Sequence, residues 1–280
     1  MPRGSITLRV DTLQRRNPVN IADFIAELYC TIDDALPDDA PQHPQAVLSL
    51  GELITIGVLQ AMKNVGQRAF YHWLKDNYGD LFPQLPERSR LFRRLETQSC
   101  WIGRFLAEPT VLGVADSYGV ELGHPVRSGR NLHQVGRKGK SNHRWIVGGK
   151  LCIVLNQLGQ IVAWDCNTAN VHDQRFLPLL ANYDGEMIIL ADTGFHRAKG
   201  DPANVKICRR GQWNVRMIVE TTFSMMTKVW NSKQMRHITW RGFEAHLSYL
   251  MAAFNILVNW NGLQPDANGH IHRSIAHFTL

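Results

Sequence analysis

The chain has 280 residues, a hydrophobic fraction of 44% and a formal net charge of +7 at pH 7. This length allows one large domain or two modest ones, and the composition excludes a disordered or fibrous protein. The basic excess favours a polyanionic partner, either a nucleic acid or an acidic membrane surface. Because the five cysteines are scattered and odd in number, the sequence predicts neither a disulfide framework nor a structural zinc site.

Two features predict a cytoplasmic protein without a membrane anchor. The N-terminal residues contain no apolar segment of the kind found in signal peptides. The most apolar stretch, Ala245–Trp260, is too short to cross a bilayer and includes His246 and Asn255. It is typical of a buried helix.

The first hundred residues are predicted to be helical. A first helix is expected near Ile21–Ile32, followed by a linker rich in Asp and Pro at Asp33–Pro44. Helical apolar spacing then covers Leu48–Met62 and Gln67–Tyr78, and a basic helix is expected around Ser89–Glu96.

The pattern changes to mixed strands and helices near Pro109. The predicted order is a strand, two strands in a hairpin, a helix, a strand, a short strand and two long helices. These elements correspond to Val111–Ala115, Trp145–Leu155 with Gln160–Trp164, His172–Leu180, Met187–Ala191, Val205–Cys208, and helices from about Trp213 and Gly242. Such an order predicts a mixed α/β sheet covered by helices.

Two aspartates occupy equivalent places in this pattern. Asp116 and Asp192 each follow a run of five apolar residues that has the composition of a buried strand. An aspartate after a strand is usually a turn former, so either residue alone has an ordinary structural interpretation. Two buried and adjacent strands would nevertheless bring both carboxylates to one edge of the sheet, where α/β proteins bind ligands.

Glu220 follows Asp192 by 28 residues, on the predicted helix from Trp213. It lies beside a stripe of apolar residues, on a polar face shared with Arg216, Ser224 and Lys228. This face is either a ladder of surface ion pairs or a means of directing Glu220 toward the aspartates. Three carboxylates together would suit magnesium, which prefers oxygen ligands, and two such ions can promote phosphodiester chemistry.

A basic segment lies between the first two predicted strands. No Asp or Glu occurs from Leu122 to Trp164. The cations of this stretch are Arg127, Arg130, Arg137, Lys138, Lys140, Arg144 and Lys150. Contact with DNA phosphates is the favoured interpretation, and a solvated loop is the alternative.

Three motifs in this order resemble the acidic motifs of the DDE transposases of bacterial insertion sequences. They are Val114–Ser117, Ile189–Phe195 and Arg216–Phe223, supported by Asn170–Asp173 and by the stretch from Leu48–Glu52 through Arg68–Tyr71. The resemblance covers roughly residues 45–260. It implies an RNase-H-like fold, with Asp116, Asp192 and Glu220 as catalytic residues and as ligands of two Mg²⁺ or Mn²⁺ ions.

The resemblance also implies partners and a domain organisation. The partners would be double-stranded DNA at terminal inverted repeats and at the target, bound by a dimer on paired ends. Residues 1–105 would bind the DNA ends, residues 106–265 would form the catalytic domain, and residues 266–280 a tail. DNA contacts are expected from Arg127, Arg130, Arg137, Lys138, Lys140, Arg144, Arg216 and Lys228.

The sequence departs from this family at two places and leaves two alternatives open. Trp213 stands where many relatives have Tyr, and Lys228 comes one residue late, which weakens the case for Lys228 as a phosphate contact. The 28 residues between Asp192 and Glu220 leave no room for the β-rich insertion of some relatives. The alternatives are an RNase-H-like metal nuclease and a transposase-derived DNA-binding protein without catalysis.

Overall fold

The computed structural model describes residues 20–37, 46–130, 132–141, 144–208, 217–263, 271, 273–278 and 280. Its N-terminal part is helical, as predicted, with α1 (Ile21–Ala35), α2 (Leu50–Lys63), α3 (Gln67–Tyr78) and α4 (Arg88–Gln98). The start of α2 follows from local chemistry, because the Ser49 hydroxyl accepts from the Glu52 N–H and the Glu52 carboxylate accepts from the Ser49 N–H. Most of the predicted linker, residues 38–45, lies outside the described residues.

The remainder forms a mixed sheet of six strands flanked by helices. The strands are β1 (Leu112–Gly123), β2 (Arg137–Ser141), β3 (Arg144–Asn156), β4 (Ile161–Thr168), β5 (Ile188–Ala191) and β6 (Val205–Ile207). β3 is antiparallel to β1, β2 and β4, whereas β5 is parallel to β1 and β6 is parallel to β5. The strand order is β2-β3-β1-β5-β6, with β4 also paired to β3, so the predicted mixed α/β sheet flanked by helices, with an N-terminal helical region, is confirmed.

Two details of the sheet differ from the prediction. β1 does not end at Asp116 but continues for seven further residues, because β3 pairs with it along almost its whole length. The strand β2, which lies within the basic segment, was not predicted. Its sequence, Arg-Lys-Gly-Lys-Ser, has no apolar alternation, and it forms an edge strand held by backbone pairing to β3.

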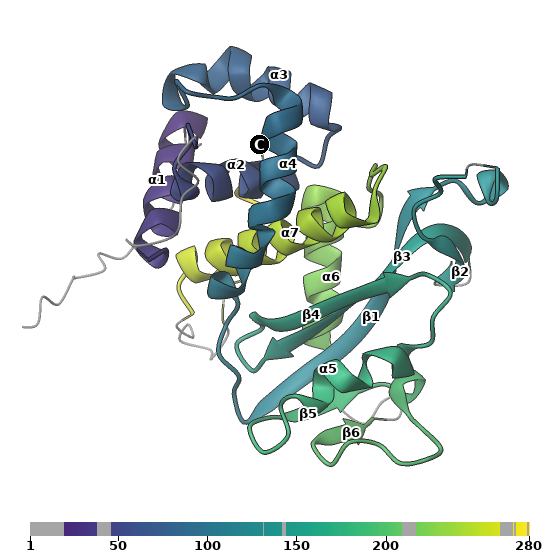
Figure 1. Ribbon diagram of the computed structural model, residues 1–280. Coiled ribbons are helices and arrows are strands. Elements are labelled where there is room, and N and C mark those ends of the chain that lie inside the picture. The colour runs from purple at the N-terminus through teal and green to yellow at the C-terminus, as the bar shows by residue number, and fades with distance from the viewer. Residues whose placement is uncertain are drawn as a thin grey trace, which may run out of the picture.

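Helices cover both faces of the sheet (Figure 1). On one face, α5 (Leu177–Ala181) and the preceding 3₁₀ turn (Asp173–Phe176) bury Phe176 and Leu177 against β1, β3 and β5. On the other face lie α6 (Met217–Trp230) and α7 (Trp240–Trp260). Residues 209–216, which include the predicted helix start at Trp213, lie outside the described residues.

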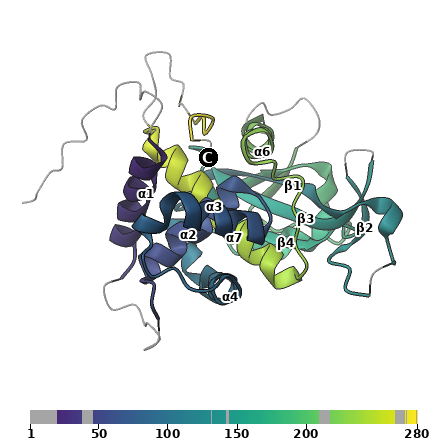
Figure 2. The same ribbon diagram turned by 90° about the horizontal axis from the view of Figure 1, so that it is seen from above.

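The helix α7 joins the helical region to the sheet. It lies between α1–α4 and the strands (Figures 1 and 2) and is buried along nearly its whole length. Tyr249 packs so closely on α2 that a Cβ at Gly57 would lie 2.3 Å from its ring. Asn255 binds backbone groups of Phe105 and Ile161. No helix in the described part of the chain is long and apolar enough to cross a membrane.

Candidate active site

The parallel pairing of β1 with β5 places Asp116 beside Asp192. The paired residues are Leu112 with Ile188, Gly113 with Ile189 and Val114 with Leu190, a constant offset of 76. Two residues further along, the same offset relates Asp116 to Asp192. Neighbouring strands lie about 4.8 Å apart. The predicted adjacency of the two strands is confirmed, and the register brings these two carboxylate-bearing positions together.

Both aspartates are held by the backbone around them. Asp116 is half-buried in the middle of β1, opposite Ile153 of β3, and its Oδ1 accepts a hydrogen bond from the Ser117 N–H at 2.7 Å. Asp192 follows the last residue of β5, where its Oδ1 accepts from the Gly194 N–H at 2.9 Å and caps the 3₁₀ turn Thr193–Phe195. The sheet therefore fixes one position and a capped turn fixes the other.

Glu220 lies on α6, which covers the same face of β1 that carries Asp116. Phe223 of α6 packs on Tyr118 with ring centroids 4.2 Å apart. Tyr118 and Asp116 share a face, because side chains two residues apart in a strand point the same way. Glu220 is exposed and lies about one helical turn before Phe223.

The three predicted acids do not form a closed metal site in this structure. Within the residues that the structure describes, no three His, Cys, Asp or Glu side chains gather closely enough to hold a metal ion. Asp116 and Asp192 are suitable ligands for such an ion, since Mg²⁺ prefers carboxylate oxygens and the strand register places these two residues side by side. Glu220 occupies the appropriate side of the sheet but is not gathered with them.

Asp173 is a fourth carboxylate at this site, although a helix-capping role is the interpretation that its sequence position favours over a place near the acids. Its Oδ1 accepts a 2.5 Å hydrogen bond from the Ser117 hydroxyl and pairs with the Lys150 ammonium at 3.0 Å. A Cβ added at Gly194 would lie 2.6 Å from Asp173 Oδ2 and 3.0 Å from Asp192 Oδ1, so these two oxygens are within about 5.6 Å of each other, the sum of the two distances. The position of Asp173 within the Asn-Val-His-Asp motif was the available signal.

The buried thiol behind the acids is inert. Cys152 is fully buried in β3, opposite Ser117. Burial raises the pKa of this thiol well above its usual value, and the nearby carboxylates of Asp116 and Asp173 raise it further. Since thiolates rather than thiols act as ligands and nucleophiles, Cys152 has a packing role.

The predicted DNA-binding cations lie mainly on β2, the start of β3 and α6. The exposed ones are Arg130, Arg137, Lys138, Lys140, Arg144 and Lys228. Arg144 pairs with Glu121 at 3.2 Å. Arg216 and the side chain of Arg127 are outside the part that the structure describes.

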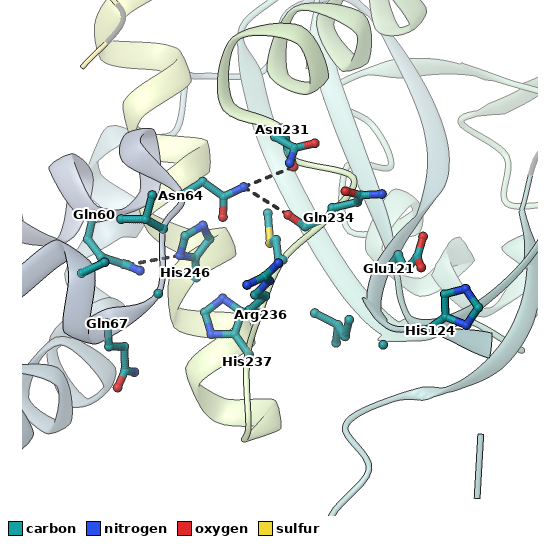
Figure 3. A pocket seen from close by; sticks show the side chains of 16 residues that line it. Gln60, Asn64, Gln67, Glu121, His124, Asn231, Gln234, Arg236, His237 and His246 are labelled. Carbon is teal, nitrogen blue, oxygen red and sulfur yellow. Dashed lines mark hydrogen bonds between the residues drawn. The ribbon is translucent and has the colours of Figure 1, made fainter. Parts of the chain in front are cut away.

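A polar pocket of about 780 Å³ lies apart from the aspartates (Figure 3). One wall comes from the junction of α2 and α3, and the others from the end of β1 and the segment linking α6 to α7. Asn64 ties two of these walls together, because its amide donates to the carbonyls of Trp230 and Gln234 at 2.7 Å and 3.2 Å. The labelled lining is mostly amide and imidazole, with one guanidinium from Arg236 and one carboxylate from Glu121.

Two histidines of this pocket, His237 and His246, have pKa values lowered by burial and are neutral near pH 7. Burial lowers the pKa of His237 to about 4, and burial together with His237 lowers that of His246 well below its usual value. The Gln60 Oε1 accepts a hydrogen bond from His246 Nδ1 at 3.1 Å. The amides and the two buried imidazoles of the pocket thus offer neutral donors and acceptors beside the C-terminal end of β1.

Comparisons with curated proteins and with solved structures give two structural likenesses. No curated protein matches the chain. Among solved structures, it is similar to the Mos1 mariner paired end complex with Mn (11% identity, 86% of this chain and 85% of that chain, TM-score 0.28). It is also similar to the Mos1 complex with Mg (13% identity, 80% and 78%, TM-score 0.26). At these TM-scores the two likenesses carry no inference here.

The family comparison covers the site directly. Residues 106–229 match the family model described as "Transposase DDE domain". This range includes β1, β5 and the described part of α6 up to Val229, and therefore Asp116, Asp192 and Glu220. Over this range the chain is similar to the transposase DDE domain family.

Proposed function

We propose that the protein is a transposase that cuts phosphodiesters at the ends of a mobile DNA element and joins the freed 3′ hydroxyl to target DNA. The observation that supports this most strongly is the common register of Asp116 and Asp192 on adjacent parallel strands, within the segment that matches the transposase DDE domain. A capping role explains Asp192 alone but not a second carboxylate at the same register position on β1.

We further propose that Asp116, Asp192 and Glu220 are the catalytic residues and hold two divalent ions, Mg²⁺ or Mn²⁺. Bound ions of this kind activate the attacking oxygen and stabilise the leaving oxygen. The chain itself would supply rigid ligands, through the pairing of Asp116 with β3 and the capped turn after Asp192. Glu220 would complete the set from α6.

The DNA would be held by cations outside this centre. The proposed contacts are Arg127, Arg130, Arg137, Lys138, Lys140, Arg144, Arg216 and Lys228. In the helical region, α4 exposes Arg88, Arg90 and Arg93, which supports binding of the terminal inverted repeats by residues 1–105. A dimer on paired ends would serve the joining of both ends.

The first test measures cleavage of a duplex that carries an element end, in Mg²⁺ and in Mn²⁺. Asp192→Asn is expected to abolish cleavage while leaving the binding of the same duplex unchanged, because the substitution removes a ligand charge and preserves the fold. Asp184→Asn is the matched control, since Asp184 is an exposed aspartate in a turn away from the site. Cleavage by the Asp192→Asn variant at the wild-type rate would reject the assignment.

A second test separates joining from cutting. A pre-cut end with a free 3′ hydroxyl should be joined to a target plasmid by the wild type, whereas a nuclease would leave it unjoined. Glu220 is exposed and is not gathered with the aspartates, which favours one rival, a DNA-binding protein that has lost catalysis. Binding of the duplex without any cleavage in either metal would support that rival.

A further inference from the structure

An exposed tryptophan lies on the basic ribbon, which we define as β2 together with the part of β3 paired with it (Arg144–Gly148). Trp145 is 56% exposed, although large aromatic side chains are usually covered. It is directly opposite Lys140 in the antiparallel register, and the Lys138 ammonium lies 5.2 Å from its ring centroid. The basic ribbon lies at the end of the molecule away from α1–α4 (Figures 1 and 2).

The two faces of the basic ribbon differ. Residues opposite each other in an antiparallel pair share a face, so Lys138, Lys140 and Trp145 lie on the same side. The other side is packed on the protein. A Cβ at Gly139 would lie 2.0 Å from the carbonyl oxygen of Ala169, so glycine there allows β2 to lie directly on the chain before the 3₁₀ turn of Asp173. The face with the tryptophan and the two lysines is therefore directed outward.

The charge around Trp145 indicates the kind of partner. No carboxylate occurs in the sequence of the basic ribbon, and the nearest one on β1, Glu121, is paired with Arg144. An aromatic ring beside unneutralised cations matches nucleic acid, in which bases stack on the ring and phosphates meet the lysines. A second copy of this face would bring like charges together. In a duplex the faces of the bases are covered by the neighbouring base pairs, so the exposed Trp145 ring suits stacking on an unpaired base.

We propose that Trp145 is a stacking platform for an unpaired base of the DNA, with Lys138 and Lys140 on the flanking phosphates. This rests on the proposed function and adds the strand state of the substrate. Ile153 lies opposite Asp116, and Trp145 precedes it by eight residues, or about 26 Å of extended strand at about 3.3 Å per residue. At 3.4 Å per nucleotide, the stacked base would lie roughly eight nucleotides from the reacting phosphate.

The experiment compares binding of a labelled 20-nucleotide single strand and of its duplex by fluorescence anisotropy across a salt series. Trp145→Ala should weaken single-strand binding at least about 5-fold, because base stacking on an aromatic ring contributes that much or more. Trp145→Phe should restore most of the affinity. Neither variant should alter the slope of log Kd against log salt, since no cation is removed, whereas Lys140→Ala should reduce that slope by about 0.7.

Matched controls make the outcomes decisive. Ile238→Ala removes another highly exposed apolar side chain outside the basic ribbon and should leave both affinities unchanged. Equal losses for Trp145→Ala and Trp145→Phe would overturn the proposal, as would an equal loss on the duplex or no loss on the single strand. Weakened binding to anionic phosphatidylserine vesicles without a single-strand effect would assign the patch to membranes instead. None of these results depends on cleavage, so they leave the Asp192 test independent.

Discussion

Replacing Asn255 with leucine should measure how strongly α7 is fixed to the sheet. Asn255 is 1% exposed. Its Oδ1 accepts from the Ile161 N–H at 2.8 Å, and its Nδ2 donates to the carbonyls of Phe105 at 2.9 Å and Ile161 at 2.8 Å. Leucine has nearly the same shape and removes all three hydrogen bonds.

The cost of this substitution can be worked out group by group. The Ile161 carbonyl retains the hydrogen bond from the Ala107 N–H, so it remains satisfied. The Ile161 N–H and the Phe105 carbonyl lose their side-chain partner, and a buried polar group without one costs about 1–3 kcal/mol. We expect the free energy of unfolding to fall by about 2–6 kcal/mol, since two groups are left unsatisfied. The melting temperature should fall by roughly 4–24 °C at about 2–4 °C per kcal/mol.

The assay is urea unfolding followed by circular dichroism, with Asn77→Leu as the control. Asn77 is exposed on α3 and donates only to the Trp73 carbonyl, so its loss should change the stability by less than about 0.5 kcal/mol. Equal stability of the two variants would show that these buried hydrogen bonds do not hold α7 to β4.

Three further predictions concern the pocket, β2 and the ion pair at the acids. Because burial lowers the pKa of His237 from 6.5 to about 4 in the folded protein, the unfolded chain binds more protons in this range, and stability should fall as the pH drops from about 6.5 to about 4. A His237→Gln, His246→Gln double variant should show a flatter pH dependence of stability in the same urea titrations, and an unchanged dependence would contradict the lowered pKa values. Gly139→Ala forces β2 away from Ala169 and should cost about 1–3 kcal/mol by thermal melting, whereas Gly103→Ala, with open space around it, should cost much less. Asp173→Asn leaves the Lys150 ammonium, whose side chain is only 15% exposed, without its carboxylate partner and should lower the free energy of unfolding by about 1–3 kcal/mol. Adding Lys150→Met should recover most of this loss, whereas a double variant as unstable as the sum of the two single variants would show that the two side chains do not stabilise each other.

The elements with strong local signals were predicted well from the sequence. The capping box at Ser49 and Glu52, the apolar run before Asp192 and the hairpin turn after Asn156 each determine structure through neighbouring residues. The adjacency of the strands bearing Asp116 and Asp192 followed from their buried composition, because only central strands are apolar on both faces. A mixed α/β sheet covered by helices was then the expected fold.

The remaining features depend on contacts between distant segments. β1 continues past Asp116 because β3 pairs with it, and β2 is a strand because Gly139 fits against Ala169, neither of which a local pattern reveals. Asp173 reaches the acids only when its 3₁₀ turn docks beside Ser117 and Lys150. Local helical spacing predicted that Glu220 lies beside the apolar stripe of its helix, but whether it gathers with the aspartates depends on tertiary packing.

The burial of α7 limits how this protein can be divided or rebuilt. The helices α1–α4 and the strands of the sheet share one apolar core with α7, so removing either part would expose apolar side chains of α7 to water. A recombinant fragment that begins near residue 106 should expose Tyr249 and its neighbours and aggregate. Exchange of the N-terminal helices between related proteins would require matching changes along α7, which makes an independently swappable recognition module an improbable route of evolution for this chain.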